Sequence, residues 1–83
     1  MDLSNLDPVE VSAKFSTDGK ITPYRFTWQG RNYQVASVGR NWKDETGLHI
    51  LVMAPGDRIF ELIYIPDQMR WVLRRLNGGR SLM

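Results

Sequence analysis

The sequence predicts an all-β fold, a five- or six-stranded antiparallel meander bent into a small barrel or half-barrel. Apolar and polar residues alternate with a period of two in several short runs, which is typical of half-buried strands. Turn pairs such as Asp-Gly, Gln-Gly and Pro-Gly separate the runs. Two further runs are apolar on both faces, as the central strands of a sheet are.

Size and composition indicate one small globular domain. The chain has 83 residues, enough for a single core. Apolar residues make up 42% and charged residues 24%, unlike a disordered chain. Three Trp, three Tyr and three Phe give the core much buried area per residue. We expect residues 1–8 to be a flexible lead-in, residues 9–76 a single β domain and residues 77–83 a mobile tail.

The absence of cysteine excludes disulfides and thiolate metal sites. Small secreted domains usually rely on disulfides, so a cytoplasmic location is expected. Residues 1–10 contain acids and no basic side chain, unlike a secretory signal. No apolar run is long enough to span a membrane, and no membrane partner is expected.

The first predicted strand is residues 9–15, where apolar residues alternate with polar ones from Val9 to Phe15. Residues 16–20 contain an Asp-Gly pair and form a predicted turn. These two segments open the meander.

The strongest local pattern is a hairpin around the two-residue turn at 29–30. Its register gives these opposed pairs: Trp28 with Arg31, Phe26 with Tyr33, and Tyr24 with Val35. Opposed residues share a face of the sheet. The hairpin is therefore predicted to gather its rings and Val35 on one buried face.

The pattern changes phase after the hairpin. A bulge or bend near Ser37-Val38-Gly39 would explain the change, because glycine inside a strand often marks one. Residues 41–47 are polar and are predicted to be a connection. Residues 48–54 and 58–65 are predicted central strands.

The last element, within residues 67–77, is ambiguous. A helical stripe fits Met69, Val72, Leu73 and Leu76. One face of a strand fits Met69, Trp71 and Leu73. The strand is the favoured interpretation and a short helix is the alternative.

Three segments carry a distinctive pattern: Pro23-x-x-Phe26-x-Trp28-x-Gly30-Arg31-x-Tyr33-x-Val35-x-x-Val38-x-x-x-Trp42, Phe60-Glu61-Leu62-x-Tyr64 and Trp71-x-Leu73-x-Arg75. With them the chain resembles, over about residues 9–76, a family of small bacterial all-β domains of unknown function with an F-x-W-x-G-R-x-Y motif. Some members of that family are encoded near Y-family-type DNA polymerases. The resemblance implies the fold and a link to nucleic-acid metabolism, and it implies no catalytic residues.

No catalytic constellation is recognisable, and we expect the domain not to be an enzyme. The one histidine, His49, lies in a predicted strand, where a structural or surface role is the simpler interpretation. Asp44 and Glu45 are adjacent acids in a polar connection, where carboxylates are usually solvated. Metal sites typically need three or four His, Cys or carboxylate ligands together. No metal or cofactor is therefore expected.

The favoured functional hypothesis is a protein-interaction or homo-oligomeric module. The two central strands carry more large apolar residues than a core of this size needs, and excess apolar surface often marks an interface. The candidate interface patch is Leu51, Met53, Ile63 and Ile65. A bent sheet that covers this face within the monomer is the competing explanation.

The alternative hypothesis is a single-strand nucleic-acid-binding accessory module. Small β domains bind single strands by combining basic side chains with aromatic platforms. The candidate contacts are Arg25, Arg31, Arg40, Trp42, Arg70 and Arg74. A net charge of +2 is small for this role, and the rings are also explained by the core. Arg31 beside Trp28 can equally be a local cation–π pair.

Overall fold

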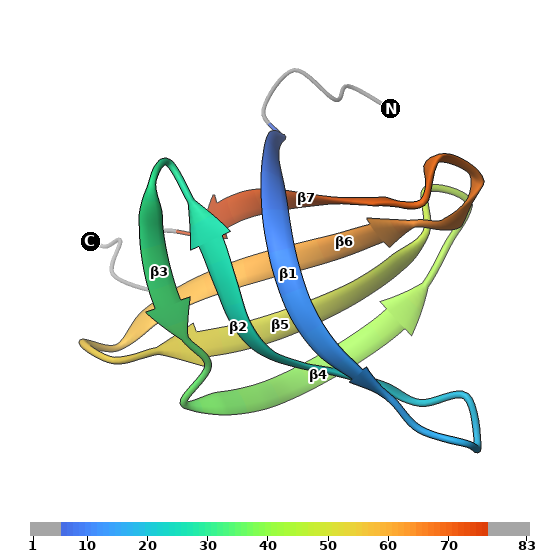
Figure 1. The fold of residues 1–83 in the computed structure, drawn as a ribbon, viewed down its shortest axis with the longest axis horizontal. Helices are drawn as coiled ribbons and strands as arrows, with labels where there is room; N and C mark the ends of the chain where they lie inside the picture. The colour runs from blue at the N-terminus through green and yellow to red at the C-terminus, as the bar shows by residue number, and fades with distance from the viewer. Residues whose placement is uncertain (1–5, 77–83) are drawn as a thin grey trace.

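The computed structural model describes residues 6–76, which form seven strands and one 3-10 turn (Figure 1). The elements are β1 (Asp7–Phe15), β2 (Ile21–Trp28), β3 (Arg31–Gln34), β4 (Ser37–Lys43), β5 (Leu48–Ala54), β6 (Arg58–Ile65), η1 (Pro66–Gln68) and β7 (Arg70–Leu76). All pairings are antiparallel, and the sheet order is β3-β2-β1-β7-β6-β5-β4. The predicted all-β class and antiparallel arrangement are confirmed.

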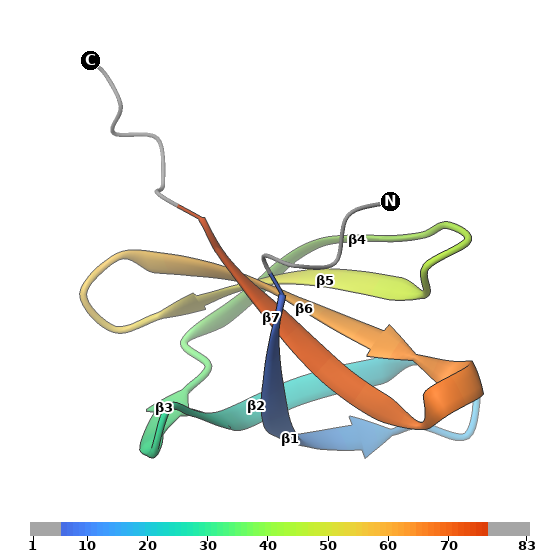
Figure 2. The same ribbon diagram turned by 90° about the horizontal axis from the view of Figure 1, so that it is seen from above.

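The sheet bends into an open half-barrel because β1 contributes to two walls. Residues 7–9 of β1 pair with β7, and residues 10–15 pair with β2. Figure 2 shows β1, β2 and β3 on one side and β4 and β5 on the other, with β6 and β7 crossing between them. At the far edge the chain crosses between the walls, where the Ala36 N–H donates to the Met53 carbonyl at 2.7 Å.

The strand count exceeds the five or six predicted, because β4 forms where a bend and a polar connection were expected. Every residue of β4 except Trp42 is exposed, so this edge strand lacks the apolar alternation that identifies a strand in sequence. Its register against β5 shifts between Val38 and Asn41, next to the expected bend at Gly39.

The β2–β3 hairpin has the predicted register from Trp28↔Arg31 to Arg25↔Gln34. Gln29 and Gly30 have φ values of 53° and 78°. Positive φ at both central residues is the requirement of a type I′ turn, whose twist matches that of the paired strands. The turn chemistry and the apolar alternation therefore agree on this hairpin.

One ring of the hairpin lies on the opposite side from the one predicted. Tyr24 is 56% exposed, whereas Pro23 and Phe26 are buried. The register of β1 against β2 shifts between Ser12 and Ala13, so the alternation of β2 changes phase at this bulge. The hairpin sequence alone does not reveal this shift, because the pairing with β1 imposes it.

The core lies between the two walls. Its buried members are Phe26, Trp28, Ile50, Val52, Ala54, Phe60, Leu62 and Leu73. The Trp28 indole Nε1 also donates a hydrogen bond of 3.1 Å to Asp7, which ties the hairpin to the start of β1.

The ambiguous C-terminal element is a strand. In β7, Leu73 faces the core and Val72 is buried on the other face, which a strand covered on both sides allows. At the other end, β1 begins at Asp7, inside the expected lead-in. Residues 1–5 and the expected mobile tail, 77–83, lie outside the described residues. Within residues 6–76, no helix is long and apolar enough to cross a membrane.

Candidate functional site

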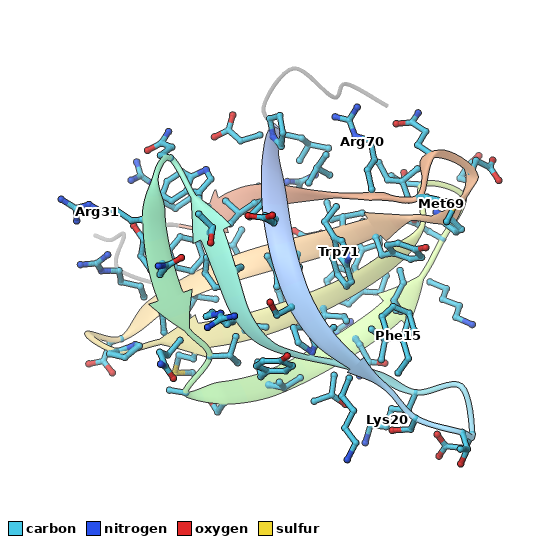
Figure 3. All side chains as sticks on the ribbon, in the orientation of Figure 1. Phe15, Lys20, Arg31, Met69, Arg70 and Trp71 are labelled. Carbon is cyan, nitrogen blue, oxygen red and sulfur yellow. The ribbon has the colours of Figure 1, made fainter. Side chains whose placement is uncertain are left out.

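A pocket of about 370 Å³ opens at the end of the half-barrel where β3 begins. It is lined by Trp28, Gln29, Arg31, Tyr33, Arg58, Phe60 and Arg75, and we call it the arginine pocket. Figure 3 shows Arg31 at this end of the molecule. The three guanidinium groups come from separate segments of the chain that the fold brings together.

Two turns and one register place the arginines. Arg31 follows the 29–30 turn and pairs with Trp28. Arg58 is the first residue of β6, after the turn that contains Asp57 with φ at 60°. Arg75 of β7 pairs with Phe60 of β6, so the two residues share the core-facing side of the sheet. They lie where the half-barrel opens.

Aromatic rings support two of these guanidinium groups. The Arg58 guanidinium carbon lies 5.8 Å from the centroid of Tyr33, and that of Arg75 lies 5.8 Å from the centroid of Trp28. Such contacts hold a guanidinium by cation–π attraction. The cation over Trp28 is therefore Arg75 and not Arg31, which the sequence suggested.

The pocket is electropositive. No acidic side chain lines it, and all three arginines are exposed. In the part of the chain that the structure describes, the ion pairs all involve His49 or Glu61, and none includes a pocket arginine. Arginine side chains without a carboxylate partner have the charge and the hydrogen-bond donors that suit an anion.

The other five candidate nucleic-acid contacts do not line this pocket. Arg25 is exposed on β2, and Arg70 lines a separate groove. Arg40 lies over Trp42 at 5.3 Å, and the ring of Trp42 stacks on His49 at 5.0 Å. Arg74 lies 3.7 Å from Glu61. The predicted set therefore contributes one member, Arg31, to the pocket, and the sequence reasoning missed Arg58 and Arg75.

A polar cluster occupies the face of β5 and β6 away from the core. His49 is 3% exposed and Glu61 is 5% exposed. The Nδ1 of His49 lies 2.5 Å from Glu61 Oε2, and its Nε2 lies 2.9 Å from Asp44 Oδ1. Each ring nitrogen thus faces a carboxylate, an arrangement in which both donate in the protonated form. Both ring nitrogens of His49 have a partner, and the cluster joins β5 to β6 and to the Asp44 loop, which is a structural role.

Asp44 is not simply solvated, as its loop position suggested. Its Oδ1 accepts hydrogen bonds from the N–H groups of Thr46 and Gly47, at 2.8 and 3.3 Å, in addition to His49. The His49 hydrogen bond, helped by these two N–H groups, holds the pKa of Asp44 below its ordinary value against the opposing effect of desolvation. Asp44 therefore fixes the β4–β5 turn and anchors His49.

Within residues 6–76, no group of three or more histidines and carboxylates has the arrangement of a metal site. The ring nitrogens of His49 contact the carboxylates of Asp44 and Glu61. A charged residue in the middle of the otherwise apolar strand β6 was the available signal for this cluster, because a buried carboxylate requires a partner.

The candidate interface patch lies on the same outer face but is interrupted by the polar cluster. Ile63 pairs with His49, and Leu51 pairs with Glu61. Met53 is 40% exposed, whereas Ile63 is fully buried. Leu51 and Ile65 are half-buried. Ile63 thus offers no surface to a partner in this conformation.

More exposed apolar side chains lie elsewhere. Met69 is 80% exposed and Phe15 is 62% exposed. The ring of Phe15 contacts Tyr64, which in turn contacts Trp71, with centroid distances of 6.5 and 5.1 Å. Figure 3 shows Phe15, Met69 and Trp71 in the half of the molecule away from Arg31, and we call these three residues the apolar surface.

Comparison of the chain with protein-family models, with curated proteins and with solved structures gives no match. The resemblance to small bacterial all-β domains remains an expectation.

Proposed function

We propose that this chain is a non-catalytic, cytoplasmic module that binds single-stranded nucleic acid through the arginine pocket. The observation that carries the proposal is the convergence of Arg31, Arg58 and Arg75 on one pocket that no carboxylate lines. The planar, permanently charged fork of arginine suits phosphate oxygens better than the ammonium of lysine does.

The shape of the site favours a single strand over a duplex. A pocket of about 370 Å³ is close to the lower limit of small-ligand sites and accommodates about one nucleotide unit. A flexible single strand can turn a phosphate into such a pocket, whereas a duplex presents its phosphates on a stiff, convex surface. Guanidinium planes also accept unstacked bases.

Fluorescence anisotropy with a labelled single strand and the matching duplex, at low and rising salt, tests the proposal. We expect the single strand to bind more tightly and its affinity to fall as salt rises. Arg58→Gln and Arg75→Gln should each weaken binding and reduce the slope of log K against log salt by about 0.7, the effect of one lost phosphate contact.

Arg25→Gln is the matched control, because Arg25 is an exposed arginine of β2 that does not line the pocket. It removes the same charge and should leave the affinity close to that of the wild type. Absence of binding at low salt, or equal losses in all three variants, would contradict the proposal.

A second function, self-association or protein binding, is favoured by the exposure of Phe15 and Met69. Phe15 continues through Tyr64 to Trp71, and contiguous apolar surface that is exposed is typical of protein contacts. Sedimentation velocity over a range of concentrations tests self-association, with Phe15→Ser/Met69→Ser as the variant expected to be monomeric. A wild-type protein that is monomeric throughout would rule out the homo-oligomer.

A further inference from the structure

We infer that the arginine pocket recognises the phosphorylated end of a nucleic-acid strand, a terminal phosphomonoester, in preference to the phosphodiesters of its interior. This inference rests on the proposed function. It concerns which part of the strand the pocket selects, and it can fail while the strand still binds.

Positive charge is concentrated in the arginine pocket. Three arginine residues line one pocket, and none of them has an ion-pair partner in the described part of the chain, residues 6–76. The guanidinium groups of Arg58 and Arg75 lie over two of its rings. An interior phosphodiester carries one negative charge. A phosphomonoester carries about 1.5 to 2 negative charges near pH 7 and offers three terminal oxygens. The terminal group therefore matches this local density of positive charge better.

The aromatic rings of the pocket are covered and offer little open surface for stacking bases. Trp28 and Phe60 are buried, with 7% and 1% of their surface exposed. Arg75 lies over the ring of Trp28, and Arg58 lies over that of Tyr33. Proteins that bind single strands without regard to their ends present open rings on which successive bases stack. Here the rings support arginines instead, so contacts to phosphate provide most of the affinity.

The arginine pocket is short compared with sites that follow a nucleic-acid backbone. Single-strand sites that follow the backbone extend over about 4–16 nucleotides for each small barrel. The arginine pocket encloses about 370 Å³, and the other candidate arginines, such as Arg25 and Arg70, lie on different surfaces. Among the residues that line the pocket, the basic ones are Arg31, Arg58 and Arg75. A compact site of this kind suits one terminal unit.

The test compares one internally labelled single strand in three forms, with a 5′-phosphate, with a 3′-phosphate, and with hydroxyl groups at both ends. We expect one phosphorylated form to bind at least about tenfold more tightly than the hydroxyl form, the effect of one added charge-assisted hydrogen bond. The preference should disappear in Arg58→Gln and Arg75→Gln and persist in Arg25→Gln. Thermal melting of the variants establishes that each is folded.

Acidification provides an independent measurement. The second ionisation of a phosphomonoester has a pKa of about 6, so the preference for the phosphorylated end should shrink below that pH. Binding of the hydroxyl form should change little over the same range, because phosphodiesters stay ionised. A preference that is constant from pH 7 to pH 5 would contradict recognition of the dianion.

The outcomes separate the inference from the function beneath it. Equal affinity for all three forms at low salt overturns end recognition and leaves single-strand binding intact. Absence of binding by every form overturns both. Competition by inorganic phosphate as effective as that by the phosphorylated strand would assign the pocket to free phosphate and overturn recognition of a strand end.

Discussion

His49 and Glu61 lie on neighbouring strands and form a buried contact, with Nδ1 and Oε2 2.5 Å apart. Both residues are at most 5% exposed. Asp44 contacts the other ring nitrogen of His49 and Arg74 approaches the other carboxylate oxygen of Glu61, so each of the two buried side chains has polar partners on both sides. The outer face of the sheet is thus held by a polar network where a purely apolar face was expected.

Breaking this pair on one side should be costly. His49→Leu leaves the buried Glu61 without its closest partner. Glu61→Leu leaves the Nδ1 of His49 without its partner. Loss of one member of a buried pair typically costs about 3–5 kcal/mol. Urea unfolding of each variant measures the loss. The control is Glu45→Gln, which changes an exposed acid next to Asp44 in the β4–β5 turn and should alter stability by less than about 0.5 kcal/mol.

The double variant His49→Leu/Glu61→Leu should be more stable than the sum of the single losses predicts. Replacing both partners removes the unpaired buried charge, so much of the penalty is recovered. Arg74 is 39% exposed in its side chain and can turn towards water. Strict additivity of the two losses would show that the pair is not coupled.

Asp44 should make the protein sensitive to acid. Its pKa is lowered in the folded state, chiefly by the His49 hydrogen bond, from an ordinary value of 3.8. A lowered carboxyl pKa contributes stability that is present above the unfolded-state value and is lost as pH falls through the folded-state value. Asp44→Asn should therefore be less stable than the wild type at pH 7.

The stability difference between Asp44→Asn and the wild type should shrink as the pH falls below about 4. Thermal melting at a series of pH values measures it. Asp18→Asn is the control, because Asp18 also accepts a local backbone hydrogen bond but contacts no histidine. A difference that is constant between pH 7 and pH 3 would show that the carboxylate of Asp44 is not the stabilising form.

The sequence could predict what adjacent residues determine. The β2–β3 hairpin follows from the alternation around Gln29-Gly30, and positive φ values at both residues agree with it. The bulge that turns Tyr24 outward comes from pairing with β1, a partner the local pattern does not contain. Strand β4 escaped detection because an exposed edge strand has no buried face to impose alternation.

The candidate site was less predictable for a related reason. Arg31, Arg58 and Arg75 line one pocket only because β3, β6 and β7 begin or end at one opening of the half-barrel. Their spacing along the chain carries no sign of this. The Phe60↔Arg75 pairing would have indicated it, but that register becomes known only once the last element is established as a strand.

Gly47 should be intolerant of any side chain. Its φ is +155°, and a Cβ there would overlap the Tyr64 carbonyl oxygen, a backbone atom that cannot move without shifting β6. Gly47→Ala should therefore cost at least about 2 kcal/mol, as strained positions with a steric conflict do. Gly39→Ala is the control, since its Cβ would meet Leu51 at an ordinary distance of 3.7 Å. Equal melting temperatures for the two variants would contradict the turn geometry.

Two apolar residues of the outer face, Ile63 and Met53, should lose very different amounts of stability when each is replaced by a charged residue. Ile63 is fully buried, so Ile63→Glu places an unpaired carboxylate in an apolar site and should cost about 3–5 kcal/mol, enough to unfold much of a domain this small. Met53 is 40% exposed, and Met53→Glu should cost less than about 1 kcal/mol. Circular dichroism and urea unfolding measure both. Ile63 supports the fold, and Met53 is the exposed residue of the candidate interface patch, so Met53→Glu should weaken any self-association through this face without unfolding the chain. An Ile63→Glu protein as stable as the wild type would instead make Ile63 available to a partner and restore it to the candidate interface.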